Sequence, residues 1–199
     1  MEKNKQSRPA AIRSLSPEHG DKKRPQPIKA IPAKDLNFFK SVNLLGDLDD
    51  AQVAQVYNIC KRRLFSKGST IMREGDPGDT MYLFSAGQVE VLNTLTMKFG
   101  KNDIEETEKS MVKLDASFVS FFGEMSLLED APRSATITAI SNCVLYELHK
   151  RDFRELCRRE PRIGYAIVSR IAEVLCARIR KSNKDILKLT TALSIALSR

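Results

Sequence analysis

The stretch FFGEMSLLEDAPRSAT, residues 121–136, places one carboxylate and one guanidinium among small residues. Gly123 predicts a sharp turn into one or two helical turns, whose first amides lack internal partners and attract anions. The planar fork of Arg133 suits a phosphate group, and an ionised Glu124 accepts hydrogen bonds from hydroxyl groups. These features fit a sugar phosphate. An ion pair between Glu124 and Arg133 that closes a loop explains the same residues, so both interpretations stay open on physical grounds.

The longer segment FGEMSLLEDAPRSATITA, residues 122–139, resembles the phosphate-binding cassette of the cyclic nucleotide-binding domain family, the type found in catabolite activator protein and the regulatory subunits of cAMP-dependent kinase. Upstream, GSTIMREGDPGDTMYLFSAGQVEV at 68–91 resembles the glycine pattern of that family, and VLYELHKRDFREL at 144–156 resembles its last strand and following helix. The resemblance covers roughly residues 36–180. One departure is LDASFVSFFGE, which lacks the Gly-Asp pair that commonly precedes the cassette.

The resemblance implies a role for each matching residue. Glu124 would accept a hydrogen bond from the ribose 2′-hydroxyl, Arg133 would pair with the cyclic phosphate, and Gly123 would let the backbone approach the ligand. Ser134 occupies a place where a hydroxyl often favours guanine, but cAMP-binding relatives also carry serine there. The cradle would be completed by backbone amides of Met125, Ser126 and Ala135.

In relatives, a residue of the C-terminal helix covers the base. The matching region lies within about 174–183, where Arg178 and Ser182 are the candidates. A guanidinium could stack on a purine. A solvated basic helix face explains Arg178 as well. The ligand implied is cAMP, or alternatively cGMP, with no additional cofactor and no metal.

Short β-rich runs separated by glycine-containing turns fill most of residues 61–148, a pattern typical of a small β-barrel or sandwich. Asp35 is a candidate N-cap before a short helix, and Val53 and Val56 predict a second helix after acidic residues. The polar segment 98–110 predicts an exposed hairpin loop. The expected fold is α+β: a small antiparallel β-roll, jelly-roll-like, flanked by N-terminal helices and a long C-terminal helix.

Three segments are expected. Residues 1–34 carry five of the eight prolines and little apolar periodicity, which predicts a disordered basic tail. Residues 35–160 would form the β-roll with its flanking helices, and 161–199 the long helix. Ten positions at alternating steps of three and four, from 165 to 196, are apolar or aromatic except Ser182. This seam predicts a coiled coil and a homodimer through residues 161–197.

Charge and composition limit the function classes. The net charge of +8 divides into +6 for residues 1–34, −6 for 35–149 and +8 for 150–199, so the body is acidic and nucleic-acid binding is unlikely. No apolar run is long enough for a membrane span, and the four cysteines form no C-x-x-C pair, so a cytoplasmic protein is expected. No catalytic constellation is recognisable, which predicts a protein that is not an enzyme.

The sequence therefore predicts a cyclic nucleotide receptor that couples ligand binding to rearrangement of its C-terminal helix and signals to an unknown protein effector. cAMP is favoured over cGMP. Two alternatives remain: an interaction scaffold that works independently of nucleotide, and a truncated transcription regulator, since no helix-turn-helix follows the long helix within the 199 residues.

Overall fold

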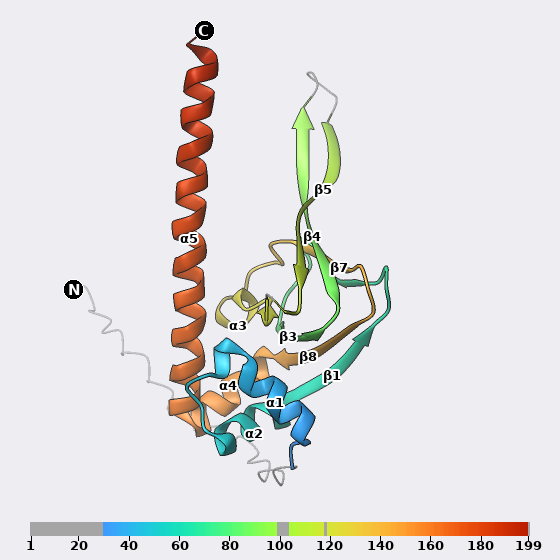
Figure 1. The fold of residues 1–199 in the computed structure, drawn as a ribbon, viewed down its shortest axis with the longest axis vertical. Helices are drawn as coiled ribbons and strands as arrows, with labels where there is room; N and C mark the ends of the chain where they lie inside the picture. The colour runs from blue at the N-terminus through green and yellow to red at the C-terminus, as the bar shows by residue number, and fades with distance from the viewer. Residues whose placement is uncertain (1–29, 99–103, 118, 199) are drawn as a thin grey trace, which may run out of the picture.

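Two four-stranded antiparallel sheets form the body of the protein, and helices cover one of them (Figure 1). The computed structural model describes residues 30–98, 104–117 and 119–198. The predicted disorder of the N-terminal tail concerns mainly residues 1–29, which lie outside the described residues. The α+β class and the antiparallel β-roll are confirmed, although the strands do not close into a barrel.

The first sheet has the order β1-β8-β3-β6 and the second has the order β2-β7-β4-β5. The strands of the first sheet are β1 (Cys60–Phe65), β8 (Cys143–His149), β3 (Thr80–Ala86) and β6 (Phe121–Phe122). Those of the second are β2 (Thr70–Met72), β7 (Thr136–Ala139), β4 (Gln88–Lys98) and β5 (Ile104–Asp115). The helices are α1 (Ala33–Ser41), the short 3-10 helix η1 (Asn43–Leu45), α2 (Asp50–Ile59), α3 (Met125–Leu128), α4 (Lys150–Arg159) and α5 (Pro161–Leu197).

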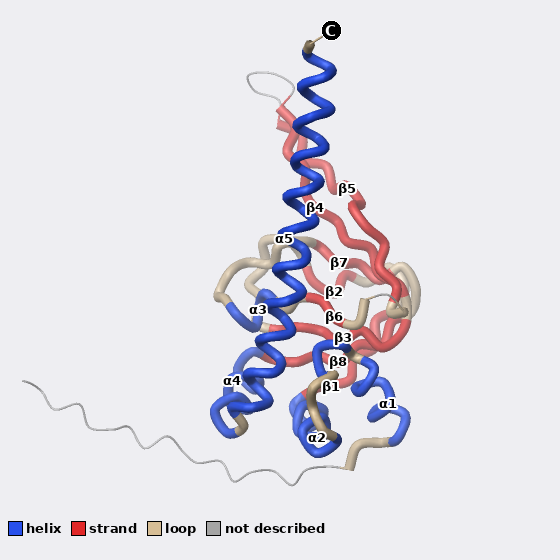
Figure 2. Tube along the Cα trace, turned by 60° about the vertical axis from the view of Figure 1, so that its left-hand side comes forward, coloured by secondary structure: helices blue, strands red, loops and turns tan. Residues whose placement is uncertain are grey.

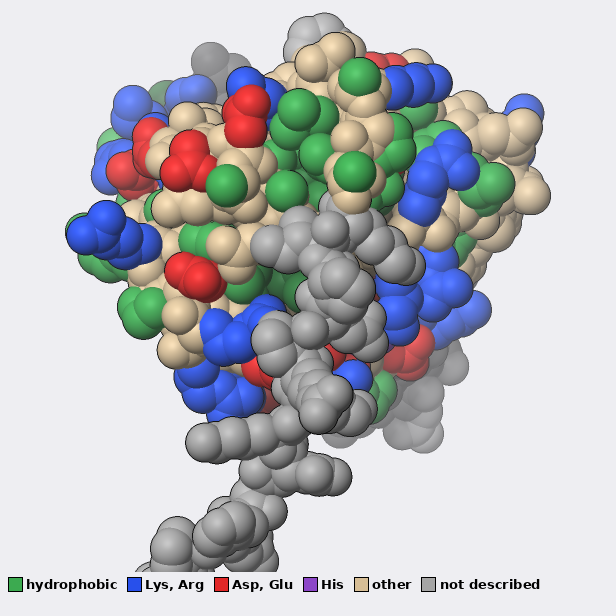
Figure 3. Space-filling view, turned by 90° about the horizontal axis from the view of Figure 1, so that it is seen from below, with side chains coloured by type: hydrophobic (Ala, Val, Ile, Leu, Met, Phe, Trp, Pro, Cys, Tyr) green, Lys and Arg blue, Asp and Glu red, His purple; other side chains and the backbone are tan. Residues whose placement is uncertain are grey.

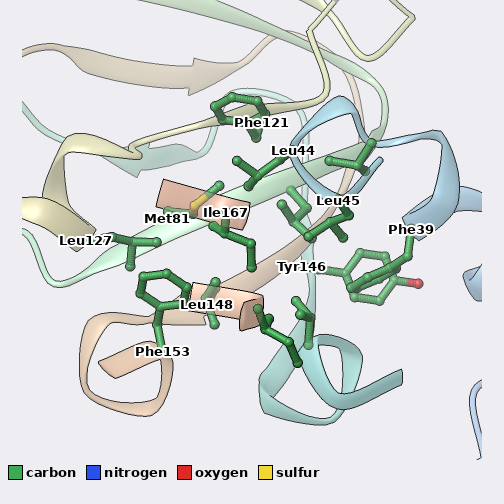
Figure 4. Packing of buried hydrophobic residues seen from close by; sticks show 14 of the residues in the cluster. Phe39, Leu44, Leu45, Met81, Phe121, Leu127, Tyr146, Leu148, Phe153 and Ile167 are labelled. Atoms are coloured by element: carbon green, nitrogen blue, oxygen red, sulfur yellow. The ribbon is translucent and has the colours of Figure 1, made fainter. Parts of the chain in front are cut away.

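The central strands of the first sheet, β8 and β3, are buried on both faces, whereas the edge strand β1 is largely exposed. Successive side chains of a strand point to opposite faces, so Met81 and Leu83 of β3 pack under the helices while Tyr82 and Phe84 pack toward the second sheet. Figure 4 shows the helix-side cluster, in which Phe153 of α4 and Ile167 of α5 meet β3 and β8. This cluster fixes α3, α4 and the start of α5 against the sheet.

Asp35 is not an N-cap. Helix α1 begins at Ala33, two residues earlier, and Asp35 lies in its first turn. Its carboxylate accepts hydrogen bonds from the hydroxyl groups of Tyr57 (3.1 Å) and Tyr146 (2.7 Å). The acid is therefore used for tertiary hydrogen bonds between α1, α2 and β8. By contrast, α2 has the expected acidic start, with the side chain of Asp49 accepting from the amide of Gln52 at 2.8 Å.

The prediction of a loop at residues 98–110 is wrong for residues 104–110, which form the first part of β5. Strand β7 pairs with β4 between Val89 and Leu92, whereas β5 pairs with β4 as far as Lys98. The outer half of the hairpin therefore extends beyond the sheet, as Figure 1 shows. Residues 104–110 are polar except Ile104 and lack the alternation of apolar residues by which a strand is recognised, so this part of β5 carried no strand signal.

Helix α5 spans 37 residues, about 55 Å at 1.5 Å per residue. Its buried residues all lie near its start: Ile163, Gly164, Ile167 and Ile171. Every residue from 176 to 198 is exposed, and Figure 2 shows the helix continuing past the strands. Within the described residues, no helix combines the length and apolar character needed to cross a membrane.

Candidate functional site

Strand β6 enters α3 through Gly123, whose φ of 74° lies in the left-handed region. A Cβ atom at this position would lie 3.1 Å from Nη1 of Arg133 and 3.3 Å from the carbonyl oxygen of Thr80. Glycine therefore permits the turn and also lets the backbone pass close to the guanidinium. The predicted turn into a short helix is present. The amide of Ser126, a predicted cradle donor, donates to the carbonyl of Gly123 at 3.2 Å and so closes this turn here.

The backbone of Arg133 is fixed by the turn that precedes β3. The amide of Arg133 donates to the carbonyl of Asp76 at 2.8 Å, and the amide of Gly75 donates to the carbonyl of Arg133 at 3.0 Å. A Cβ atom on Gly78 would lie 2.8 Å from Nε of Arg133 and 2.6 Å from Oγ of Ser126. The glycine-rich segment GDPGD thus supplies both the backbone partners of Arg133 and the space for its side chain.

The Arg133 guanidinium is buried, with 8% of the residue exposed, and it donates to neutral oxygen atoms. Nη1 donates to the carbonyl of Thr80 at 2.6 Å and to Oγ of Ser126 at 2.9 Å, and Nη2 donates to Oγ1 of Thr80 at 2.6 Å. Burial lowers the pKa of the Arg133 guanidinium, which nevertheless stays charged at neutral pH. Within the described residues, no carboxylate forms an ion pair with this cation. Its charge is therefore available to an anion.

Glu124 is 2% exposed and forms an ion pair with Arg178 of α5, whose side chain is half-exposed. Nη1 of Arg178 donates to Oε1 of Glu124. Helix α5 passes beside α3 in both ribbon views (Figures 1 and 2). The charge of Glu124 is thus balanced by α5, whereas no described carboxylate forms such an ion pair with Arg133. The ion pair between Glu124 and Arg133 that the sequence left open is not formed.

Glu124, Arg133 and Arg178 line one cavity of about 440 Å³. This volume is within the range of small-molecule sites. The other predicted cassette residues also line its polar end, together with the neighbouring Pro132: Gly123, Met125, Ser126, Ser134 and Ala135. The opposite part is apolar and comes from both sheets and the segment before β6: Met72, Val91, Val112, Leu114, Val119, Phe122 and Ile137. The cavity thus joins an anion-binding end to an apolar end.

The predicted site residues come together with one exception. Gly123, Glu124, Met125, Ser126, Arg133, Ser134, Ala135 and Arg178 all line the cavity. Ser182 does not line it and is exposed, one helical turn beyond Arg178. Their roles toward a ligand remain predictions. In this structure the guanidinium of Arg178 is paired with the carboxylate of Glu124. This differs from the expected arrangement, in which it would stack on the base of the ligand.

Sequence reasoning missed Thr80, Gly78 and Asn93. Thr80 supplies two acceptors to Arg133, and Asn93 lines the cavity and donates from Nδ2 to the carbonyl of Ser134 at 2.9 Å. Thr80 directly follows the turn GDPGD, so a hydroxyl placed after that turn was the available signal. Asn93 carries no local signal, because it reaches the cassette by the pairing of β4 with β7.

The comparison with protein families gives one matching family model, described as Cyclic nucleotide-binding domain, over residues 62–160. The match extends from β1 to the end of α4 and contains both Glu124 and Arg133. Among curated proteins, the chain is 31% identical over 131 residues to a cyclic nucleotide-gated potassium channel of Mesorhizobium japonicum, covering 66% of this chain and 32% of that protein. It is 33% identical over 119 residues to the cAMP-dependent protein kinase regulatory subunit of Aspergillus niger, covering 60% of this chain and 26% of that protein.

The chain therefore spans a third or less of these two relatives. Solved structures give the same picture of the fold. The catabolite activator protein of Thermus thermophilus matches with a TM-score of 0.60 and 28% identity, covering 74% of this chain and 62% of that one. A cyclic nucleotide-binding domain from Methylobacillus flagellatus matches with a TM-score of 0.61 and 26% identity, covering 77% of this chain and 81% of that one.

Proposed function

Because the chain belongs to the cyclic nucleotide-binding domain family through residues 62–160, we propose that it is a receptor for cAMP that signals to a protein effector through α5. The observation that carries this proposal is the buried, unneutralised charge of Arg133 beside the buried carboxylate of Glu124 in one cavity. A cyclic nucleotide offers one negative phosphate and one ribose hydroxyl, which match these two groups in charge and hydrogen bonding.

The cyclic phosphate would take the Arg133 end of the cavity. In the structure the guanidinium donates to Thr80 and Ser126, which are neutral acceptors. A phosphate oxygen is a stronger, charge-assisted acceptor and would replace at least one of them. The ribose 2′-hydroxyl would donate to Glu124. A carboxylate accepts through both oxygens, so Oε2 can take the hydroxyl while Oε1 keeps Arg178.

The base would occupy the apolar end, against side chains of both sheets such as Val91 and Ile137. We favour adenine because relatives of this chain are named for cAMP, among them the kinase regulatory subunit of Aspergillus niger. Guanine carries a carbonyl oxygen and a ring N–H where adenine carries its amino group and a bare ring nitrogen, and guanine has its amino group at C2. An apolar surface gives these groups no partners. The relative from Aspergillus niger is by name a regulatory subunit, so we propose a regulatory rather than a catalytic role for this chain too.

We expect cAMP to bind more tightly than cGMP. The measurement is displacement of a fluorescent cAMP analogue by each unlabelled nucleotide, with 5′-AMP as the control for recognition of the cyclic phosphate. A higher affinity for cGMP would contradict the proposed base preference while leaving the phosphate and ribose roles intact. Equal displacement by 5′-AMP would contradict recognition of the cyclic phosphate.

Arg178→Ala is expected to weaken cAMP binding by about three- to tenfold. Arg178 holds the Glu124 carboxylate and joins α5 to the cavity, and a half-exposed ion pair contributes about 0.5–1.5 kcal/mol. The affinity of the variant by calorimetry is the measurement. Lys181→Ala, an exposed cation on the same helix outside the cavity, is the matched control and should bind as the native chain does. Unchanged affinity in Arg178→Ala would show that α5 is not coupled to the ligand through this residue.

We also propose that α5 pairs with α5 of a second copy. Its predicted seam includes four residues that are each between 58% and 71% exposed: Ile179, Ile186, Leu189 and Leu193. These side chains lie beyond the part of the helix that packs on its own domain, so a second helix is the natural way to bury them. Arg178 lies next to this seam, which gives a route from the cavity to the helix pair.

Replacing Ile186 and Leu193 together with Glu should make the protein monomeric, because charges in the seam cannot be paired there. Sedimentation velocity measures the change. Leu187→Glu is the matched control, since Leu187 is also exposed and adjacent but lies outside the seam; it should leave the dimer intact. A native chain that sediments as a monomer at all concentrations tested would contradict the proposed dimer.

A further inference from the structure

A second hollow, of about 630 Å³, lies beside α4 and shares no lining residue with the nucleotide cavity. Its lining contains four cations, one acid and a thiol: Asp79, Lys150, Arg151, Arg154, Cys157 and Arg158. We call this hollow, with its cations Lys150, Arg151, Arg154 and Arg158, the α4 basic hollow. Seen from the end of the molecule that carries α1, α2 and α4, Lys and Arg side chains gather in several groups on the surface (Figure 3). Residues 35–149 are acidic, whereas α4 carries five Lys or Arg against two acids, so the hollow lies where the basic C-terminal part of the chain begins.

Three of the cations form a row along one face of α4. Arg151, Arg154 and Arg158 are spaced three and four residues apart, which places them on the same side of a helix. They are exposed, and they span about 10 Å along the helix axis. Lys150 lies at the base of the row and is buried. Its Nζ donates to the carbonyl of Glu129 and to Oδ1 of Asp130, both at 2.6 Å.

The row is only weakly neutralised by the protein itself. Arg154 and Arg158 form no hydrogen bond or ion pair in the described part of the chain, and Arg151 contacts its exposed neighbour Asp152 at 3.2 Å. The acid of the hollow, Asp79, is itself largely exposed and lies 3.6 Å from Nδ1 of His149. The exposed guanidinium groups are therefore available to negative charges from outside.

We propose that the α4 basic hollow binds an extended acidic segment of a partner protein. The Cα atoms of neighbouring arginines in the row are separated by about 4.5 and 6 Å along the helix axis. Alternate side chains of an extended chain lie about 7 Å apart on one face, so acidic residues at alternate positions can each meet one flexible arginine. A single small anion can contact one end of the row but cannot reach all of it.

The partner is a different protein rather than a tail of this chain. The other basic segments of the chain, residues 1–34 and 160–199, carry +6 and +5, so like charges oppose their docking on the row. Helix α4 also contacts the nucleotide site indirectly. Lys150 holds the end of α3, and Leu127 of α3 belongs to the same core cluster as Phe153 of α4. A partner on α4 therefore binds next to an element of the nucleotide site, although its binding does not depend on the proposed ligand.

The test uses the full chain and a fluorescein-labelled peptide of about twelve residues in which Glu and Ser alternate. Fluorescence anisotropy should give saturable binding that weakens between 50 and 200 mM salt. The triple variant Arg151→Gln, Arg154→Gln and Arg158→Gln should bind at least about tenfold more weakly, because each exposed ion pair contributes a factor of about two to five. The matched control removes three exposed cations of α5, Arg180→Gln, Lys181→Gln and Lys184→Gln, and should bind within about twofold of the native chain.

Equal losses in the triple variant and in the control would overturn the proposal, since they would mean binding through net charge alone. A single-stranded oligonucleotide of about twelve nucleotides that binds more tightly than the peptide, and loses this binding in the triple variant, would also overturn it by making the hollow a nucleic-acid site. Inorganic phosphate that displaces the peptide at micromolar concentration would overturn it in favour of a small-anion site. Calorimetry with cAMP on the triple variant keeps the two sites separate: it should match the native chain, whether or not the native chain binds cAMP.

Discussion

Arg133→Ala is expected to lower the affinity for cAMP by at least about 30-fold. The guanidinium is buried, has no carboxylate partner among the described residues, and lines the same cavity as Glu124. Removing one partner of a buried, hydrogen-bonded charge pair costs about 2–5 kcal/mol, and about 1.4 kcal/mol corresponds to tenfold in affinity. Calorimetric titration of the variant gives the loss directly. The effect should fall on cAMP and cGMP alike, because the phosphate is common to both.

Arg133 also has a structural role, because it joins α3 to β3 through Ser126 and Thr80. Thermal denaturation must therefore accompany the titration. Arg133→Lys keeps the positive charge but loses the two-pronged donor geometry, so it should fold and still bind more weakly than the native chain. Arg180→Ala, an exposed cation of α5 outside the cavity, is the control for charge alone. Native affinity in a folded Arg133→Ala would exclude this residue as the phosphate partner.

Ile167→Ala is expected to destabilise the protein by about 2–5 kcal/mol. Ile167 is fully buried where the start of α5 packs against α4 and the first sheet, as Figure 4 shows. Truncating a buried isoleucine removes apolar contacts and leaves a cavity, and the cost depends on how far the surroundings relax. Urea denaturation without ligand, at one fixed protein concentration, measures the change in the free energy of unfolding.

Ile195→Ala is the matched control for this prediction. It makes the same change in the same helix, but Ile195 is exposed and lies outside the dimer seam, so its effect should stay within about 0.5 kcal/mol. A loss below about 1 kcal/mol in Ile167→Ala would mean that the start of α5 is not firmly packed on the domain. In that case Arg178 would not be held over the cavity by the core, and the coupling that we propose would need another route.

The sequence predicted the local part of the site well. Gly123, Glu124 and Arg133 lie within eleven consecutive residues and all line one cavity. The turn at Gly123 and the helical turn after it place Glu124, whereas Arg133 is also held by the turn at residues 75–79 and by Thr80. The strands were also recognisable where they are covered, because a strand buried on one or both faces must carry apolar residues in a regular pattern.

The partners of these residues could not be predicted, because they depend on tertiary packing. Arg178 meets Glu124 across 54 positions of sequence, and Thr80 meets Arg133 across 53. Nothing in the composition of α5 distinguishes Arg178 from its basic neighbours until the helix is placed on the core through Ile163, Ile167 and Ile171. Similarly, aspartate is a common N-cap residue, yet the carboxylate of Asp35 is held by hydrogen bonds from two tyrosines that are distant in sequence.

The central claim is that this chain binds cAMP in the cavity formed around Glu124 and Arg133. Its most direct test is calorimetric titration of the native protein, purified free of bound nucleotide, with cAMP. We predict saturable binding with one nucleotide per chain. The claim would be contradicted by two results together. Titration with cAMP up to millimolar concentrations would give no saturable heat, and cAMP would not shift the melting temperature.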